Sequence, residues 1–198
     1  DNTVYVVQTS PANMLEQLKH GEIDGFIAWE PFNAIAVQQE IGDILIKSEE
    51  FWPNHPCCVL AISKEITDPQ LVEALAWAHV KASDFINDPS NKEKVIAYAA
   101  EFTSQPPDVV RHALDYIEFV DVANEAELQR FEEALRANGL VDENYQGLGY
   151  HSREEFWDDF LLDGFILKVK ERLKNAPDWQ PHPIITTTQI GRASCRER

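Results

Sequence analysis

Residues 21–32 constrain the fold of this chain more than any other stretch. They read GEIDGFIAWEPF, and their short apolar run ends at Trp29. Pro31 follows, and proline is favoured at the first position of a helix. From Ala34 onward the apolar residues follow helical spacing. This order predicts a buried strand that leads directly into a helix, which is how an α/β lobe presents groups to a small ligand at the carboxyl end of a strand.

The remaining sequence predicts an α/β part followed by a mostly helical part. Short apolar runs predict strands at residues 3–8, 23–29, 44–47 and 57–63. Helices at about 11–20 and 31–41 separate the first three strands, so these strands are expected to pair in parallel. Further helices are predicted at about 67–88, 91–102, 108–117, 125–138 and 153–173.

Several local signals mark where these helices begin and end. Ser10 before a proline, Asn124 and Ser152 have the side chains and spacing of helix N-caps, while Gly21 and Gly139 are expected to stop helices. Gly164 weakens the prediction that the last helix is continuous. The buried stripe of the long helix is expected at Val72, Leu75, His79, Ala82 and Ile86.

Both ends of the sequence are unusual. The chain begins with Asp, and the strand at 3–8 starts without a preceding turn, so we expect that the natural protein continues upstream. Residues 190–198 resemble the in-frame translation of a sequencing adapter and are set aside, although a basic tail that binds an acidic partner is the alternative.

Composition limits the possible partners. The chain of 198 residues is 44% hydrophobic, which is enough for a sizeable core, and its formal net charge is −17. So acidic a protein is a poor partner for nucleic acid or an anionic membrane surface. No apolar run is long enough to span a bilayer.

The stretch from Leu15 to Pro31 resembles a pattern found in solute-binding proteins of ABC importers. In the branch that serves nitrate, sulfonates and the thiamine pyrimidine precursor, a helix is often followed by G-x-[IV]-D-[AG]-x-x-x-W-[DE]-P. The resemblance continues through WPNHPCCVLAISK at residues 52–64 and the helices that follow, covering roughly residues 3–175. The order of the motifs carries it, since no single motif is diagnostic.

The resemblance implies a type II periplasmic-binding-protein fold of class α/β, with one lobe nearly complete and the C-terminal helices of the other. Residues 1–56 would belong to the second lobe. Residues 57–189 would hold the hinge-crossing strand, the helical remainder of the first lobe and the C-terminal region. It further implies an extracytoplasmic monomer that delivers a small solute to a membrane permease, with no cofactor and no enzymatic activity.

The candidate ligand-binding residues follow from the same resemblance. Trp29 and Phe32 would wall the cleft, Glu30 and Asn33 would offer polar contacts, and the segment around His55 and Cys57 would line the hinge. Each has a plainer alternative. Trp29 could be an ordinary core residue, Glu30 could cap its helix, and the cysteines could be small core residues.

The charge of Glu30 bears on the choice of solute. No Lys or Arg occurs between residues 21 and 46, and a carboxylate near a bound anion is repelled unless a cation intervenes. The local charge therefore favours a neutral or cationic ligand such as an aminopyrimidine, unless another part of the protein supplies a cation.

Metal binding and catalysis are less favoured. His55, Cys57 and Cys58 are suitable donors, but neighbouring residues of a strand point to opposite faces, so both thiolates would not reach one ion. No phosphate loop, nucleophile elbow or HExxH helix occurs. The acid pairs 132–133 and 158–159 are expected to be solvated surface. The alternatives that remain are a thiamine-pyrimidine synthase of the same fold and a ligand-sensing module.

Overall fold

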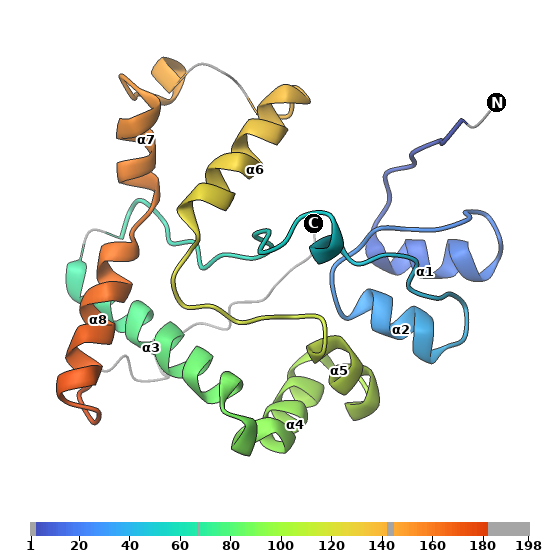
Figure 1. Ribbon diagram of the computed structural model, residues 1–198, viewed down its shortest axis with the longest axis horizontal. Helices are drawn as coiled ribbons and strands as arrows, with labels where there is room; N and C mark the ends of the chain where they lie inside the picture. The colour runs from blue at the N-terminus through green and yellow to red at the C-terminus, as the bar shows by residue number, and fades with distance from the viewer. Residues whose placement is uncertain (1–2, 67, 142–144, 182–198) are drawn as a thin grey trace. The chain divides into compact units, whose positions relative to one another are not determined.

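The computed structural model describes residues 3–66, 68–141 and 145–181 (Figure 1). The chain divides into two compact units. Unit 1 consists of residues 1–53 and 86–119, and unit 2 consists of residues 54–85 and 120–198. The expected assignment of residues 1–56 and 57–189 to two lobes stays a prediction, and residues 190–198 lie outside the described residues.

Unit 1 is built on a small helical core. Its helices are α1 (Pro11–Lys19), α2 (Phe32–Gln38), α4 (Lys92–Thr103) and α5 (Pro107–Leu114), with 3₁₀ turns η1 (Ser48–Glu50) and η2 (Pro89–Asn91). Helix α2 packs against α1 and α5, and α5 also packs on α4 (Figure 1). Ala34 and Ile35 of α2 meet Val109 and Ala113 of α5, and Leu15 of α1 joins them. The small alanines let the two helices approach closely.

Unit 2 contains most of α3 (Pro69–Asn87) together with α6 (Glu125–Ala137), η3 (Tyr145–Leu148), α7 (Arg153–Phe160) and α8 (Asp163–Asn175). Helices α3 and α8 share a core in which Ala76 and Val80 contact Val169. Aromatic and aliphatic side chains pack around it: Trp77, Phe165, Ile166, Leu173 and Trp179. The indole N–H of Trp77 donates to the backbone oxygen of Trp179 at 3.0 Å. This bond ties the segment after α8 to α3.

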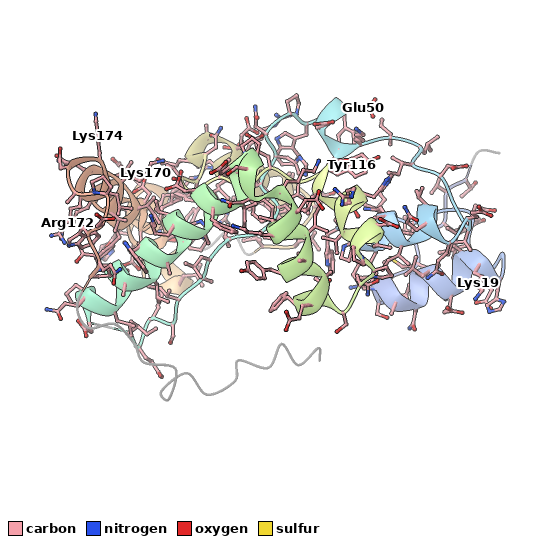
Figure 2. The ribbon with its side chains drawn as sticks, turned by 90° about the horizontal axis from the view of Figure 1, so that it is seen from below. Lys19, Glu50, Tyr116, Lys170, Arg172 and Lys174 are labelled. Carbon is pink, nitrogen blue, oxygen red and sulfur yellow. The ribbon has the colours of Figure 1, made fainter. Side chains whose placement is uncertain are left out.

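Ion pairs also hold α8 in unit 2. Figure 2 shows Lys170 and Arg172 on this helix, where Lys170 Nζ lies 2.6 Å from Asp121 Oδ2 and Arg172 Nη1 lies 2.9 Å from Glu73 Oε1. The two acids are largely buried and the two cations are half-exposed. Such pairs fix the helix in place more than they add stability.

The predicted helix ends are mostly confirmed. The side chains of Ser10, Asn124 and Ser152 each accept a hydrogen bond from the backbone N–H three residues later, as N-caps do. Gly21 and Gly139 have φ of 68° and 69°, the left-handed conformation that a residue just past a helix end adopts.

Two helical predictions need correction. The segment predicted as one helix over 153–173 is two helices, because Leu161 takes extended backbone angles between α7 and α8. The buried stripe of α3 runs through Ala76, Val80 and Ser83 instead of the predicted set. Ala76 and Val80 of this stripe pack against Val169 of α8.

The predicted strands differ most from the structure. No strand is present in the described ranges 3–66, 68–141 and 145–181, so segments 3–8, 23–29, 44–47 and 57–63 are not strands there. Their apolar side chains are largely exposed, for example Val6 at 91% and Leu45 at 96%. A strand needs a neighbour for its backbone N–H and C=O groups, and an apolar run in the sequence does not supply one.

Candidate functional site

The corner formed by Trp29 to Asn33 lies in unit 1, where the segment 23–28 meets α2. The Trp29 side chain is 60% exposed, and its ring meets the Phe32 ring edge to face, with centroids 6.1 Å apart and an interplanar angle of 85°. This arrangement is a favourable aromatic pairing. It leaves a large, rigid aromatic surface available at the start of a helix.

Glu30 and Asn33 shape this corner through backbone contacts. Glu30 Oε2 accepts a hydrogen bond from the N–H of Ala34 at 3.0 Å, so its carboxylate satisfies a donor in the first turn of α2. Asn33 Nδ2 donates to the carbonyl oxygen of Ala28 at 2.7 Å. The peptide bond between Glu30 and Pro31 is cis. The capping interpretation of Glu30 is therefore confirmed, whereas ligand contact by either residue stays a prediction.

The helix behind the corner is firmly anchored. Ala34 is fully buried and Ala36 nearly so, while the neighbouring Ile35 packs into the core of unit 1. Trp29 lies three residues before α2 and is 60% exposed. An anchored helix start thus carries the exposed Trp29 and the partly buried Phe32, as a preformed binding surface requires.

His55 and Cys57 belong to unit 2. His55 is partly buried, and Cys57 and Cys58 are exposed free thiols, so the alternative that the cysteines are core residues is wrong, and ligand contact by Cys57 stays a prediction. The two sulfur atoms are 3.6 Å apart and share a hydrogen bond. Because residues 57–63 are not a strand, the two side chains are not forced to opposite faces.

The environment of Cys57 changes its acidity. Desolvation raises the pKa of the Cys57 thiol, and the hydrogen bond with Cys58 raises this pKa further. At neutral pH Cys57 is thus a thiol more than a thiolate. In the described part of the chain, no group of three or more His, Cys, Asp or Glu side chains could hold a metal ion.

The burial of Glu132 differs most from the prediction for a single side chain. This residue was expected at the surface, yet it is only 8% exposed. It belongs to α6 and contacts side chains of η3 and α7. It accepts hydrogen bonds from Arg136 Nε at 2.7 Å, from Arg153 Nε and Trp157 Nε1 at 3.1 Å each, and from the hydroxyl of Tyr145. Its neighbour Glu133 remains exposed. Burial of Glu132 is possible because its partners satisfy the carboxylate.

The electrostatics of Glu132 follow from these contacts. Burial acts to raise the pKa of the Glu132 carboxyl, but the hydrogen bonds from Tyr145, Arg136, Arg153 and Trp157 outweigh it and lower the pKa below its usual value. The carboxylate is therefore charged at neutral pH. Both carboxylate oxygens accept hydrogen bonds from protein side chains. We call Glu132 and these four partners the Glu132 clamp, because they hold α6, η3 and α7 together.

Two open depressions occur in unit 2. One of about 420 Å³ is lined by Leu161, Leu162, Asp163, Gly164, Phe165 and Lys168, and one of about 300 Å³ by Glu125, Gln129, Arg153, Glu154, Trp157 and Asp158. None of the six predicted ligand-binding residues lines either depression. Over residues 3–66, 68–141 and 145–181, no helix combines the length and apolarity needed to cross a membrane.

Sequence comparison relates the chain to transport proteins of cyanobacteria. It is 35% identical over 97 residues to a bicarbonate transport ATP-binding protein, CmpC, of Synechococcus elongatus, a match that covers 48% of this chain and 15% of that protein. It is 29% identical over 102 residues to a nitrate import ATP-binding protein, NrtC, of Synechocystis, covering 50% of this chain and 15% of that protein.

A third relative is named as a binding protein. The chain is 25% identical over 126 residues to a nitrate/nitrite binding protein, NrtA, of Nostoc, covering 61% of this chain and 29% of that protein. The chain thus spans less than a third of the length of each of these curated relatives. No solved structure matches the chain significantly.

The family comparison covers the part of the chain that holds the corner. Residues 1–100, which are half of the chain, match the NMT1-like family. This range contains all six predicted ligand-binding residues, from Trp29 to Cys57. The chain belongs to the NMT1-like family.

Proposed function

We propose that the chain is part of a solute-binding protein of an ABC importer that captures a small oxyanion of the nitrate or bicarbonate kind. The match of residues 1–100 to the NMT1-like family carries this proposal, and family membership implies a periplasmic-binding-protein fold. Relatives named for nitrate and bicarbonate transport support the class of solute. A sulfonate or a thiamine pyrimidine precursor is the alternative solute.

The proposed mechanism is passive capture without covalent chemistry. Two lobes close around the solute because the closed state binds it more tightly, and the closed form docks on a membrane permease. Trp29 and Phe32 form one wall of the cleft, Asn33 offers an amide, and the segment with His55 and Cys57 lines the hinge. The protein acts outside the cytoplasm and as a monomer.

The cap on α2 removes the main reason to expect a cationic ligand. Glu30 already has a partner in the N–H of Ala34, so its presence in the corner requires no cationic ligand. It remains a negative charge beside the proposed cleft. At about 8 Å and an effective dielectric constant of about 20, it would oppose a bound monovalent anion by about 2 kcal/mol.

The Glu30→Gln variant tests the class of solute. Glutamine can still accept the hydrogen bond from Ala34, while the repulsion is removed, so we expect roughly threefold to tenfold tighter binding of nitrate or bicarbonate after screening by salt. Calorimetry of the protein expressed from its complete reading frame measures this. The panel should contain nitrate, bicarbonate, an alkyl sulfonate and an aminopyrimidine.

The opposite result identifies a different solute. If the aminopyrimidine alone binds and Glu30→Gln weakens it tenfold or more, the carboxylate bonds the ligand and the oxyanion proposal is wrong. If no member of the panel binds the protein from the complete reading frame, the solute-binding role itself is contradicted.

A ligand-sensing module is a second candidate function. Two of the relatives described above are named as ATP-binding proteins, yet the 198 residues contain no phosphate-loop pattern. The complete reading frame decides between the two functions, because a sensing module would share its polypeptide with a phosphate loop.

A further inference from the structure

Cys57 and Cys58 form an exposed pair whose sulfur atoms are in contact. Their Sγ atoms lie 3.6 Å apart, and one thiol donates a hydrogen bond to the other sulfur. Both residues are exposed in unit 2, four and five residues after the chain leaves unit 1. A regular strand would hold the two side chains on opposite faces, but this segment is not a strand.

We propose that Cys57 and Cys58 are a reversible redox site, which an organic disulfide oxidises to a vicinal disulfide. One cysteine thiolate attacks a sulfur of the oxidant, which breaks the oxidant's S–S bond and releases one thiolate. The second cysteine then attacks the mixed disulfide, forming the bond between the two Sγ atoms and releasing the second thiolate. The two cysteine protons end on the two released thiols, so the cysteines lose two electrons and the oxidant gains them.

The geometry makes this bond a labile one. Consecutive Cα atoms are about 3.8 Å apart, whereas the Cα atoms of ordinary disulfides are about 4.4–6.8 Å apart. A disulfide between neighbours is therefore strained and easily reduced, as regulatory disulfides are. The proposal rests on the contact between the two sulfur atoms and not on the proposed solute binding, in which Cys57 would line the hinge.

Other chemistry for this pair is less well supported. Two thiolates bound to one tetrahedral zinc ion would be about 3.8 Å apart, but such a site needs further protein ligands. The described residues offer no third metal-binding side chain near the pair, since they contain no group of three such residues. Exposure of both thiols favours exchange with a small soluble partner.

The full chain with Cys195→Ser tests the proposal, since Cys57 and Cys58 are then its only thiols. The protein is incubated with oxidised glutathione at about pH 8.5, where a free cysteine is half ionised. We expect the loss of both free thiols, a mass lower by two hydrogens, no attached glutathione, and a monomer on a non-reducing gel. Reduced glutathione should restore both thiols.

Single substitutions in the same background provide the matched controls. Cys57→Ser and Cys58→Ser should each keep one glutathione as a stable mixed disulfide, because the second attack is removed. Two persistent glutathione adducts on the Cys195→Ser chain, or disulfide-linked dimers, would overturn the proposal.

A second measurement does not depend on oxidation. Phenylarsine oxide loses its oxygen as water when its arsenic atom bonds two thiols, so the Cys195→Ser chain should bind one equivalent and resist competition by a monothiol. Either single serine variant should lose this resistance. Equal resistance in the variants would show that the two sulfur atoms do not act together.

Discussion

Glu132 shows what one buried carboxylate contributes in this protein. It accepts hydrogen bonds from side chains of α6, η3 and α7, including two guanidinium groups. Replacing it by Gln removes the charge that balances Arg136 and Arg153. We expect Glu132→Gln to lower the free energy of unfolding by about 2 kcal/mol, less than for a fully buried ion pair because Arg153 is partly exposed. Urea unfolding followed by tryptophan fluorescence measures the change.

The control and the pH dependence sharpen this prediction. Glu133→Gln removes an exposed partner of Arg153 and should cost less than about 0.5 kcal/mol. The pKa of Glu132 is lowered in the folded state, so its contribution is complete above the unfolded pKa near 4.5 and is lost as the pH falls through the folded pKa. The difference between wild type and Glu132→Gln should therefore shrink below about pH 4.5. Equal costs for the two variants at pH 7 would contradict the clamp.

The N-cap residues of this protein fix where its helices begin. The Asn124 side chain accepts from the N–H of Glu127 at 3.2 Å and starts α6. Asn124→Ala removes this acceptor and should destabilise the helix by about 1 kcal/mol, while Asn124→Asp should preserve it. Hydrogen exchange in the first turn of α6 is the measurement. Unchanged protection in Asn124→Ala would mean that tertiary packing, and not the cap, fixes this helix end.

The elements also show how far the sequence predicts the fold. Caps and helical periodicity are local, so α1 to α6 were predicted with small errors at their ends, while α7 and α8 were predicted as one helix. The shifted stripe of α3 depends on α8 packing against α3, which periodicity does not encode. Gly164 was the local signal of the break near Leu161. Strand pairing is less local still, and the apolar runs around Val6 and Leu45 were predicted as strands although no partner strand adjoins them in the described residues.

In the candidate site, too, local contacts could be predicted from the sequence and contacts between distant residues could not. The Glu30 cap could be predicted from an acidic residue before Pro31, because a cap needs only its own helix. The burial of Glu132 could not, since its partners Tyr145 and Arg153 come from other elements. An Arg four residues after Glu132 was the one local signal. The contact between Cys57 and Cys58 was not predicted, because residues 57–63 were expected to form a strand, which would hold the two side chains on opposite faces.

The net negative charge of the chain affects the stability of the whole molecule. A formal net charge of −17 creates self-repulsion that dissolved salt screens. We expect the urea midpoint to rise as sodium chloride is increased from about 10 mM to about 300 mM, over which the Debye length falls from about 30 Å to below 10 Å. The Glu132 clamp is buried, so the cost of Glu132→Gln should change little over this range. A midpoint that falls with salt would show that favourable surface ion pairs outweigh the net repulsion.

The central claim is that the exposed aromatic corner of an NMT1-like protein contacts the solute. Calorimetry of the protein from its complete reading frame, titrated with nitrate and bicarbonate, tests it with two variants. Trp29→Ala should weaken binding at least tenfold, which is about 1.4 kcal/mol. Phe102→Ala, which removes another exposed aromatic of unit 1, on α4, should bind as the wild type does. Wild-type affinity in Trp29→Ala would contradict the account.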